Sequence, residues 1–98
     1  MIKVAILGYG TVGSGVFQII KENKELITNK AGQEINIKYV LDLREFPGDP
    51  CENVLVHDYN IILNDPEVEV IIEVMGGLKP SYDFVKSALE AGKSVCTS

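Results

Sequence analysis

The sequence predicts an α/β domain with a mainly parallel, doubly wound sheet that carries helices on both faces. Apolar runs of strand length alternate with helical patterns along the 98 residues. Two of these runs, residues 2–7 and 68–75, are apolar enough to be buried on both faces, as inner parallel strands are. A glycine-rich loop joins the first run to the first helix. Strands that alternate with helices of this length need right-handed crossovers, which produce a parallel sheet.

The first half of the chain is predicted to form a strand, a helix and a second strand. Residues 2–7 are apolar except for Lys3, which indicates a central strand. The periodicity predicts a helix from Thr11 to about Lys24, and residues 29–32 are typical of a turn. The apolar face of that helix is expected to hold Val12, Val16, Phe17, Ile19 and Ile20. Residues 34–43 alternate as a strand does, with Ile35, Ile37, Tyr39 and Leu41 on one face and Asn36, Lys38, Val40 and Asp42 on the other.

The second half begins with a loop and a short strand–helix pair. Residues 44–53 are rich in proline and glycine, residues 54–56 suit a short strand, and Asp58 suits the cap of a short helix. That helix is expected to end before Pro66, because the residue before a proline avoids the helical region. The remaining elements are an inner strand at 68–75, a helix from Pro80 or Ser81 to Gly92 with Phe84, Val85, Ala88 and Leu89 on its apolar face, and a last strand at 93–97.

Composition and charge exclude several classes of protein. With 46% hydrophobic and 23% charged residues, residues 1–98 fit one globular domain. No run approaches the roughly 20 apolar residues of a membrane span, and the first residues lack a signal-peptide pattern, so a cytoplasmic protein is expected. The net charge of −5 argues against nucleic acid as a partner. Cys96, in an apolar run, is expected to be buried, Cys51, in a polar loop, is expected to be a surface thiol, and no disulfide is expected.

The motif Gly8-Tyr9-Gly10-Thr11-Val12-Gly13 carries the clearest functional signal. A G-x-G-x-x-G motif after a strand and before a helix is the fingerprint of a Rossmann-like dinucleotide-binding domain. Gly8 would allow the tight turn, Gly10 the approach of a pyrophosphate, and Gly13 the packing of helix on strand. The amides of Thr11 and Val12 would face phosphate oxygens at the positive end of the helix. A glycine-rich turn without a ligand, and a Thr11 that only starts the helix, are the alternatives.

The end of the second strand, Asp42-Leu43-Arg44, is expected to face the adenosine ribose. In a doubly wound sheet the ligand lies at the carboxyl ends of the strands. A carboxylate at this place accepts the ribose 2′-hydroxyl of NAD, whereas an arginine holds the 2′-phosphate of NADP. Because Asp42 and Arg44 favour opposite cofactors, the sequence leaves NADP and NAD both open. Either charge alone is also compatible with a solvated loop edge.

Two further strand ends complete the expected cofactor site. Met75, Gly76 and Gly77 end the inner strand, where the glycines let the backbone pass close to a ribose or nicotinamide, although a plain turn uses glycine equally well. The hydroxyls of Thr97 and Ser98 are expected near the nicotinamide ribose or carboxamide. No catalytic or metal-ligating residue is assigned.

Three other ionisable residues allow both a functional and a structural interpretation. Glu69 is interpreted as a residue without a catalytic role, because it lies near the start of its strand, away from the ligand end. Glu73 lies nearer that end, and a catalytic role for it stays open. His57 lacks neighbouring ligands at metal-site spacing and is interpreted as a structural histidine.

These residues together resemble the NAD(P)-binding domain of homoserine dehydrogenase. The resemblance rests on the glycine motif, on Ile72-Glu73-Val74-Met75-Gly76-Gly77 and on Ala88-Leu89-Glu90-Ala91-Gly92-Lys93-Ser94-Val95-Cys96-Thr97. It implies reversible reduction of aspartate 4-semialdehyde to L-homoserine with NADPH or NADH, on the route to threonine, methionine and isoleucine. It also implies that the matched positions are cofactor contacts, and that the catalytic residues and most of the dimer interface lie in a substrate domain outside these residues.

The resemblance therefore predicts an oxidoreductase domain that is inactive by itself. Its expected partners are the dinucleotide, a small amino-acid substrate in the full-length enzyme only, and other copies in a homo-oligomer, since the last strand leaves an open sheet edge. A stand-alone nucleotide-binding or sensor module, and another amino-acid dehydrogenase of similar architecture, remain the alternatives.

Overall fold

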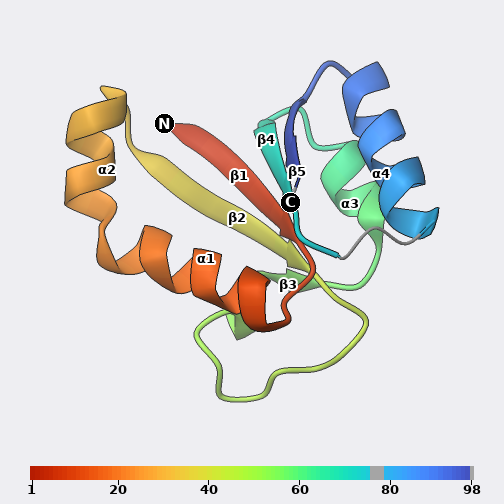
Figure 1. Cartoon of the computed structure of the whole chain (residues 1–98), viewed down its shortest axis with the longest axis horizontal. Coiled ribbons are helices and arrows are strands. Elements are labelled where there is room, and N and C mark those ends of the chain that lie inside the picture. The colour runs from red at the N-terminus through yellow and green to blue at the C-terminus, as the bar shows by residue number, and fades with distance from the viewer. Residues whose placement is uncertain (76–78, 98) are drawn as a thin grey trace.

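The computed structural model describes residues 1–75 and 79–97 and contains one five-stranded parallel sheet. The strand order is β3-β2-β1-β4-β5, with the most apolar strand at the centre (Figure 1). The strands are β1 (Ile2–Leu7), β2 (Ile35–Leu41), β3 (Leu55–Val56), β4 (Val68–Glu73) and β5 (Ser94–Thr97). The helices are α1 (Thr11–Glu22), α2 (Lys24–Ala31), the 3-10 turn η1 (Glu52–Val54), α3 (Tyr59–Leu63) and α4 (Lys79–Glu90). The predicted parallel, doubly wound fold is confirmed.

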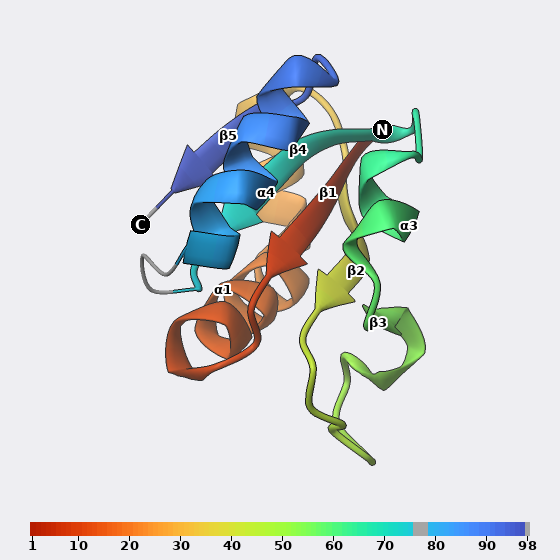
Figure 2. The ribbon, with the colours of Figure 1, turned by 90° about the vertical axis from the view of Figure 1, so that its right-hand side faces the viewer.

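The helices form two layers, one on each face of the sheet (Figures 1 and 2). On the α1 side, Phe17 packs with Ile6 and Val40 in one buried cluster. On the α3 and α4 side, Ile62 and Ala88 pack against the sheet in a second cluster. The chain builds β1, β2 and β3 in one direction and then returns to place β4 on the other side of β1. The reversal opens a crevice at the carboxyl ends of β1 and β4, where doubly wound sheets bind ligands.

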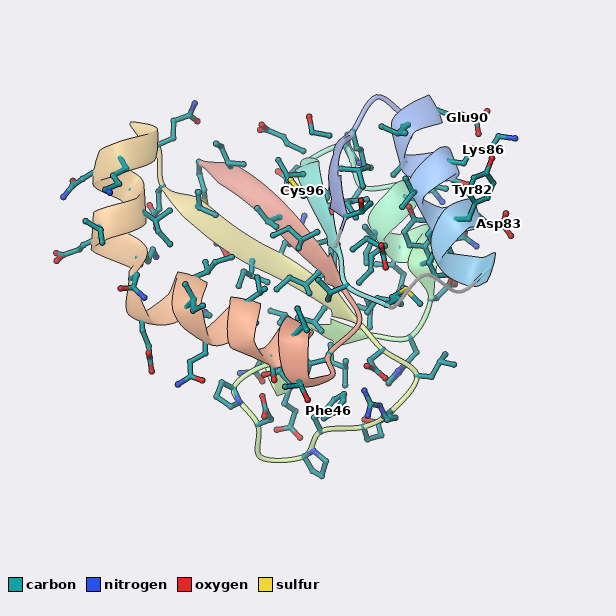
Figure 3. All side chains as sticks on the ribbon, viewed as in Figure 1. Phe46, Tyr82, Asp83, Lys86, Glu90 and Cys96 are labelled. Atoms are coloured by element: carbon teal, nitrogen blue, oxygen red, sulfur yellow. The ribbon has the colours of Figure 1, made fainter. Side chains whose placement is uncertain are left out.

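The outer face of α4 is polar, as its sequence pattern requires. Tyr82, Asp83, Lys86 and Glu90 lie on the side of α4 that is turned away from the sheet (Figure 3). Leu89 was predicted on the apolar face but is 57% exposed, whereas Ala88 is fully buried. Among the helices at residues 1–75 and 79–97, none combines the length and the apolar character that a bilayer crossing requires.

The first helical region differs from its prediction in extent and in face. A break at Asn23 separates α1 from a second helix, α2, where a fading pattern and a turn were expected; Gly32, with φ of +72°, ends α2. The buried face of α1 is centred on Gly13 and Phe17, while Val12 and Ile19 are 56% and 59% exposed. The helical periodicity predicted that the larger side chains, including Val12 and Ile19, face the sheet. In the structure, Gly13 and Phe17 are the buried residues of α1.

Strand β2 departs from simple alternation. Its pairing with β1 shifts between Val4↔Ile37 and Ala5↔Tyr39, so that Lys38 is an extra residue. Ile37 consequently packs on the α1 side with Val40, and Tyr39 packs on the other side, which corrects the expected grouping of Ile37 with Tyr39. One inserted residue is enough to exchange the faces of a strand.

The two cysteines are placed opposite to expectation. Cys51 is completely buried, because the loop at 44–53 folds back under the α1 side of the sheet. Cys96 is exposed, because it lies on β5, an edge strand with β4 as its one neighbour (Figure 3). Both are unpaired thiols.

Candidate functional site

The glycine loop is shaped by two glycines that the protein itself requires. Gly8 has φ of +99°, and a Cβ there would lie 3.2 Å from the Met75 side chain. A Cβ on Gly13 would lie 2.0 Å from the carbonyl oxygen of Gly8. The tight turn expected of Gly8 and the close packing expected of Gly13 are therefore confirmed. Together they place the start of α1 directly at the carboxyl end of β1.

Gly10 is different, because nothing in the described part of the chain requires a glycine there. Its φ is −78°, which any residue adopts, and the nearest atom to a Cβ would be Arg44 Nη2 at 3.9 Å. The missing side chain leaves free space immediately before α1. The first amides of a helix have no partner within it and carry its positive end. Thr11 and Val12, both exposed, provide those amides beside that space.

Asp42 and Arg44 are brought together by the structure, although the sequence suggested opposite roles for them. The carboxylate of Asp42 accepts the backbone N–H groups of Tyr9 and Arg44, each at 2.9 Å. It also accepts Arg44 Nη2 at 3.0 Å and Nε at 3.1 Å. The hydrogen bonds from the Arg44 side chain lower the pKa of Asp42 to about 2, against the opposing effect of burial. The side chain of Leu43, between them, is 88% exposed.

This pair defines what a ribose or a phosphate would meet. The Asp42 side chain is 10% exposed and accepts hydrogen bonds from the Tyr9 N–H, the Arg44 N–H and the Arg44 guanidinium. The Arg44 side chain is 64% exposed. A 2′-phosphate at this place would compete with Asp42 for the guanidinium, and a 2′-hydroxyl would share the carboxylate with it. The geometry keeps both cofactor chemistries available.

His57 is a site residue that the sequence analysis did not assign. Its Nδ1 lies 2.6 Å from the backbone oxygen of Asp42, and its Nε2 lies 2.9 Å from Glu45 Oε1. Both neighbours are acceptors, and only a doubly protonated ring donates from both nitrogens. The backbone carbonyl of Asp42, with the Glu45 carboxylate, raises the pKa of His57. These contacts favour the charged form of the ring.

A cleft of about 540 Å³ joins these features at the carboxyl ends of β1, β2 and β4. One wall is aromatic: the rings of Tyr59 and Phe84 stack with centroids 4.2 Å apart, and the Tyr59 hydroxyl donates to the Phe84 carbonyl at 2.7 Å. A flat apolar wall beside polar groups suits a heteroaromatic ring. The lining residues are Gly8, Tyr9, Gly10, Leu41, Asp42, Leu43, Arg44, His57, Tyr59, Val74, Met75 and Phe84.

Part of this lining was predicted from the sequence. The glycine loop, the end of β2 and Met75 were expected there, whereas Phe84 was expected on a helix face and Tyr59 was not singled out. The only available signal for the aromatic wall was the position of these residues after β3 and β4, and it becomes specific only once the strand order is known.

The last expected strand end contributes less. Thr97 pairs in register with Glu73 but does not line the cleft within residues 1–75 and 79–97. Glu73 is buried, and its carboxylate accepts the Met75 N–H at 2.5 Å, so it shapes the end of β4. Glu69 is exposed. Gly76, Gly77 and Ser98 lie outside the residues that the structure describes.

Comparison with known proteins supplies the family context for this cleft. Residues 8–98 match the family model described as homoserine dehydrogenase, NAD binding domain. The homoserine dehydrogenase of Bacillus subtilis is 37% identical over 99% of this chain, which covers 23% of that protein. The enzyme of Helicobacter pylori is 33% identical, with the same coverage of both proteins.

Solved structures agree in fold as well as sequence. The crystal structure of Staphylococcus aureus homoserine dehydrogenase has a TM-score of 0.88 and 40% identity, over 99% of this chain and 26% of that one. The enzyme of Thiobacillus denitrificans has a TM-score of 0.84 and 34% identity, over 98% and 23%. The chain thus spans about a quarter of the length of the relatives it matches.

Proposed function

The chain belongs to the homoserine dehydrogenase family, as its NAD-binding domain, and we propose that the cleft holds NADPH or NADH. The amides of Thr11 and Val12 bind the pyrophosphate, and Asp42 and Arg44 meet the adenosine ribose. The stacked rings of Tyr59 and Phe84 form the wall for adenine. We assign Met75 and Thr97, near the ends of β4 and β5, to the nicotinamide side, together with Gly76, Gly77 and Ser98, which follow them in the sequence.

One observation carries the proposal. Gly10 is a glycine that the protein's own conformation and packing do not need, since its φ is ordinary and a Cβ would meet nothing closer than 3.9 Å. A ligand that must touch the backbone at that point supplies the need. A pyrophosphate at the positive end of α1 is such a ligand.

The reaction proposed for the whole protein is the interconversion of L-homoserine and L-aspartate 4-semialdehyde, in the synthesis of threonine, methionine and isoleucine. The bound nicotinamide supplies the hydride chemistry. The residues of this chain bind and orient it, and the groups that act on the amino-acid substrate lie outside residues 1–98. These residues alone should not turn over substrate. We further propose that the whole protein is a homo-oligomer, as the family resemblance implies, and that two thiols without a disulfide suit a reducing compartment such as the cytoplasm.

The binding test compares Gly10→Ala with Gly15→Ala. Both positions have room for a methyl group in the protein itself. We expect Gly10→Ala to weaken NADPH and NADH by about 100-fold while the domain stays folded, because the methyl group keeps phosphate from the backbone; the free-energy loss is about 2.7 kcal/mol. Gly15→Ala should leave both affinities unchanged. Fluorescence of the reduced nicotinamide measures binding, and equal affinities in the two variants would refute the proposal.

Cofactor choice is tested separately with Arg44→Ala. If Arg44 holds the 2′-phosphate, the variant loses affinity for NADPH by roughly tenfold or more and little for NADH, because a hydrogen bond to a charged group contributes about 1.5–3 kcal/mol. Equal losses would show that Arg44 does not hold it. The reaction itself is tested in the longer protein that carries this domain, by comparing oxidation of homoserine with oxidation of aspartate.

A further inference from the structure

Tyr9, the second residue of the glycine motif, makes contacts that binding a pyrophosphate does not need. Its backbone N–H donates to Asp42 Oδ2 at 2.9 Å. Its hydroxyl donates to Asp49 Oδ1 at 2.6 Å. The side chain is 6% exposed and packs on the α1 side of the sheet. One residue of the phosphate loop is therefore bonded to both ends of the segment 42–49.

The segment between those two bonds carries Arg44 on a connected set of contacts. The Phe46 ring packs edge-on against Tyr9, with centroids 4.9 Å apart, and the Arg44 guanidinium lies 5.2 Å from the centre of the same ring. Phe46 lies beside the start of α1 (Figure 3). The Asp49 N–H closes a turn on the Phe46 carbonyl at 3.1 Å. The hydroxyl of Tyr9 thus holds the turn whose first residue supports the guanidinium.

Asp49 is held from two sides. Its Oδ1 accepts the Tyr9 hydroxyl and also the Cys51 N–H at 3.0 Å. Cys51 is fully buried in the same cluster as Tyr9 and Phe17. Burial, and then the bond to Asp49, raise the pKa of the Tyr9 phenol, so it remains a donor at every physiological pH. Arg44, by contrast, is mostly exposed and bonds directly to Asp42 alone among its described partners.

We propose that Tyr9 is a positioning residue for cofactor selection: its hydroxyl bond to Asp49 and its contact with Phe46 fix the segment 42–49 and so place Arg44 at the adenosine end of the cleft. The ligand concerned is the 2′-phosphomonoester of a dinucleotide. This inference rests on the proposed function of the cleft. Because Tyr9 stands between Gly8 and Gly10 of the glycine motif, the motif itself would contribute to the selection between NADPH and NADH.

The test is Tyr9→Phe, with Tyr39→Phe as the matched control. Each change removes one tyrosine hydroxyl that donates to an aspartate, at 2.6 Å to Asp49 and at 2.7 Å to Asp65. Phenylalanine keeps the ring contacts of Tyr9. We expect Tyr9→Phe to weaken NADPH about tenfold and NADH less than twofold. The Tyr39 hydroxyl bonds Asp65, before the amino end of β4, and neither residue is in the described lining of the cleft, so Tyr39→Phe should change neither affinity.

A purely structural role for the Tyr9 hydroxyl makes a different prediction, namely equal losses for both dinucleotides or none. Either result overturns the inference, as does a wild-type chain that binds NADH but not NADPH. A wild-type chain that binds neither dinucleotide refutes the proposed function as well, so the two failures are distinguishable. If Tyr9→Phe does not fold by circular dichroism, Phe46→Leu, which removes the ring beneath Arg44, is held to the same selective loss of NADPH.

Discussion

At the carboxyl end of the sheet, Asp42 bonds Tyr9 and Arg44; toward the amino end, Asp65 bonds Tyr39 and Lys38. The residue types are nearly the same, but the surroundings differ. Lys38 also reaches Glu67 at 2.8 Å, and Glu67 in turn reaches Lys3 at 2.9 Å. Near the amino end, the lysines and carboxylates of this network therefore neutralise one another.

The carboxyl end leaves its donors accessible. Arg44 and His57 stand at the rim of a 540 Å³ cleft, next to the first amides of α1. Each cation has one carboxylate, Asp42 or Glu45, and the Arg44 and Glu45 side chains are 64% and 77% exposed. A closed network contributes to stability, whereas exposed cations beside unpaired helix amides form a site that an anion can enter. The difference between the two ends is one between stability and binding.

The largest expected effect comes from breaking the carboxyl end with Gly13→Ala. The added Cβ would lie 2.0 Å from the Gly8 carbonyl oxygen, so either α1 or the loop must move. We expect a loss of about 3 kcal/mol in the free energy of unfolding, and no measurable dinucleotide binding. Urea denaturation and nicotinamide fluorescence measure the two effects. Gly15→Ala is the control, and it should stabilise α1 by about 0.5–1 kcal/mol, since Ala is the better helix former.

The fold could be predicted from the sequence because local patterns determine it. Apolar runs, the capping residue Asp58 and the stop at Gly92 each act within a few residues, and the structure bears them out: Asp58 accepts the Asn60 N–H at 2.9 Å, and Gly92 has φ of +83°. What failed depends on contacts between distant residues. The extra residue Lys38 in β2 and the buried Cys51 follow from pairing with β1 and from the bond between Tyr9 and Asp49, which no local pattern reports.

In the candidate site, too, the features set by local sequence could be predicted, and those set by contacts between distant residues could not. The positions of Asp42 and Arg44 followed from strand ends, but their mutual bonding depends on side-chain direction. His57 was interpreted as structural because it lacks neighbouring ligands at metal-site spacing. Its partners, the Asp42 carbonyl and Glu45, lie 15 and 12 positions earlier in the chain, where no local pattern indicates them. The stacking of Tyr59 on Phe84 requires α3 and α4 to lie side by side.

The second prediction concerns a substitution near the amino ends of the strands that leaves the cleft at the carboxyl ends unchanged. Lys93 is 8% exposed, and its Nζ donates to the carbonyl oxygens of Asp65 and Val68, each at 2.8 Å. Lys93→Met keeps most of the volume and removes both bonds, so we expect the free energy of unfolding to fall by about 2 kcal/mol. Affinity for NADPH and NADH, measured on the folded fraction, should stay unchanged. A parallel loss of affinity would mean that the two ends are not independent.

Acid provides a third test, of similar size, at Asp42. Its pKa falls from the usual 3.8 to about 2 in the folded chain. A lowered pKa gives stability that is present above the usual value and is lost as the pH falls through the folded value. At about 1.4 kcal/mol per unit, the contribution is about 2 kcal/mol. The stability gap between wild type and Asp42→Asn should therefore close between pH 4 and pH 2.

The matching experiment at the amino end sharpens this result. The pKa of Asp65 is also lowered, chiefly by Lys38 and then by the Tyr39 hydroxyl. Asp65→Asn should show the same direction of pH dependence. A saturating dinucleotide stabilises every folded variant that binds it. It should change the pH dependence of the stability gap between wild type and Asp42→Asn, but not that of the gap between wild type and Asp65→Asn, because Asp42 lines the cleft and Asp65 does not.

The smallest expected effect belongs to His57, the single histidine of the chain. Its folded pKa is raised, so its contribution to stability is complete below the usual value of 6.5 and is lost as the pH rises through the higher, folded value. The His57→Gln variant keeps a donor for the Asp42 carbonyl without the charge, so its stability should match wild type at pH 9 and fall slightly behind at pH 6. Proton NMR of the one imidazole gives the pKa directly. An imidazole that titrates at or below 6.5 would show that the Asp42 carbonyl and Glu45 do not hold the ring protonated, and Arg44 would then be the one lasting cation among the described residues that line the cleft.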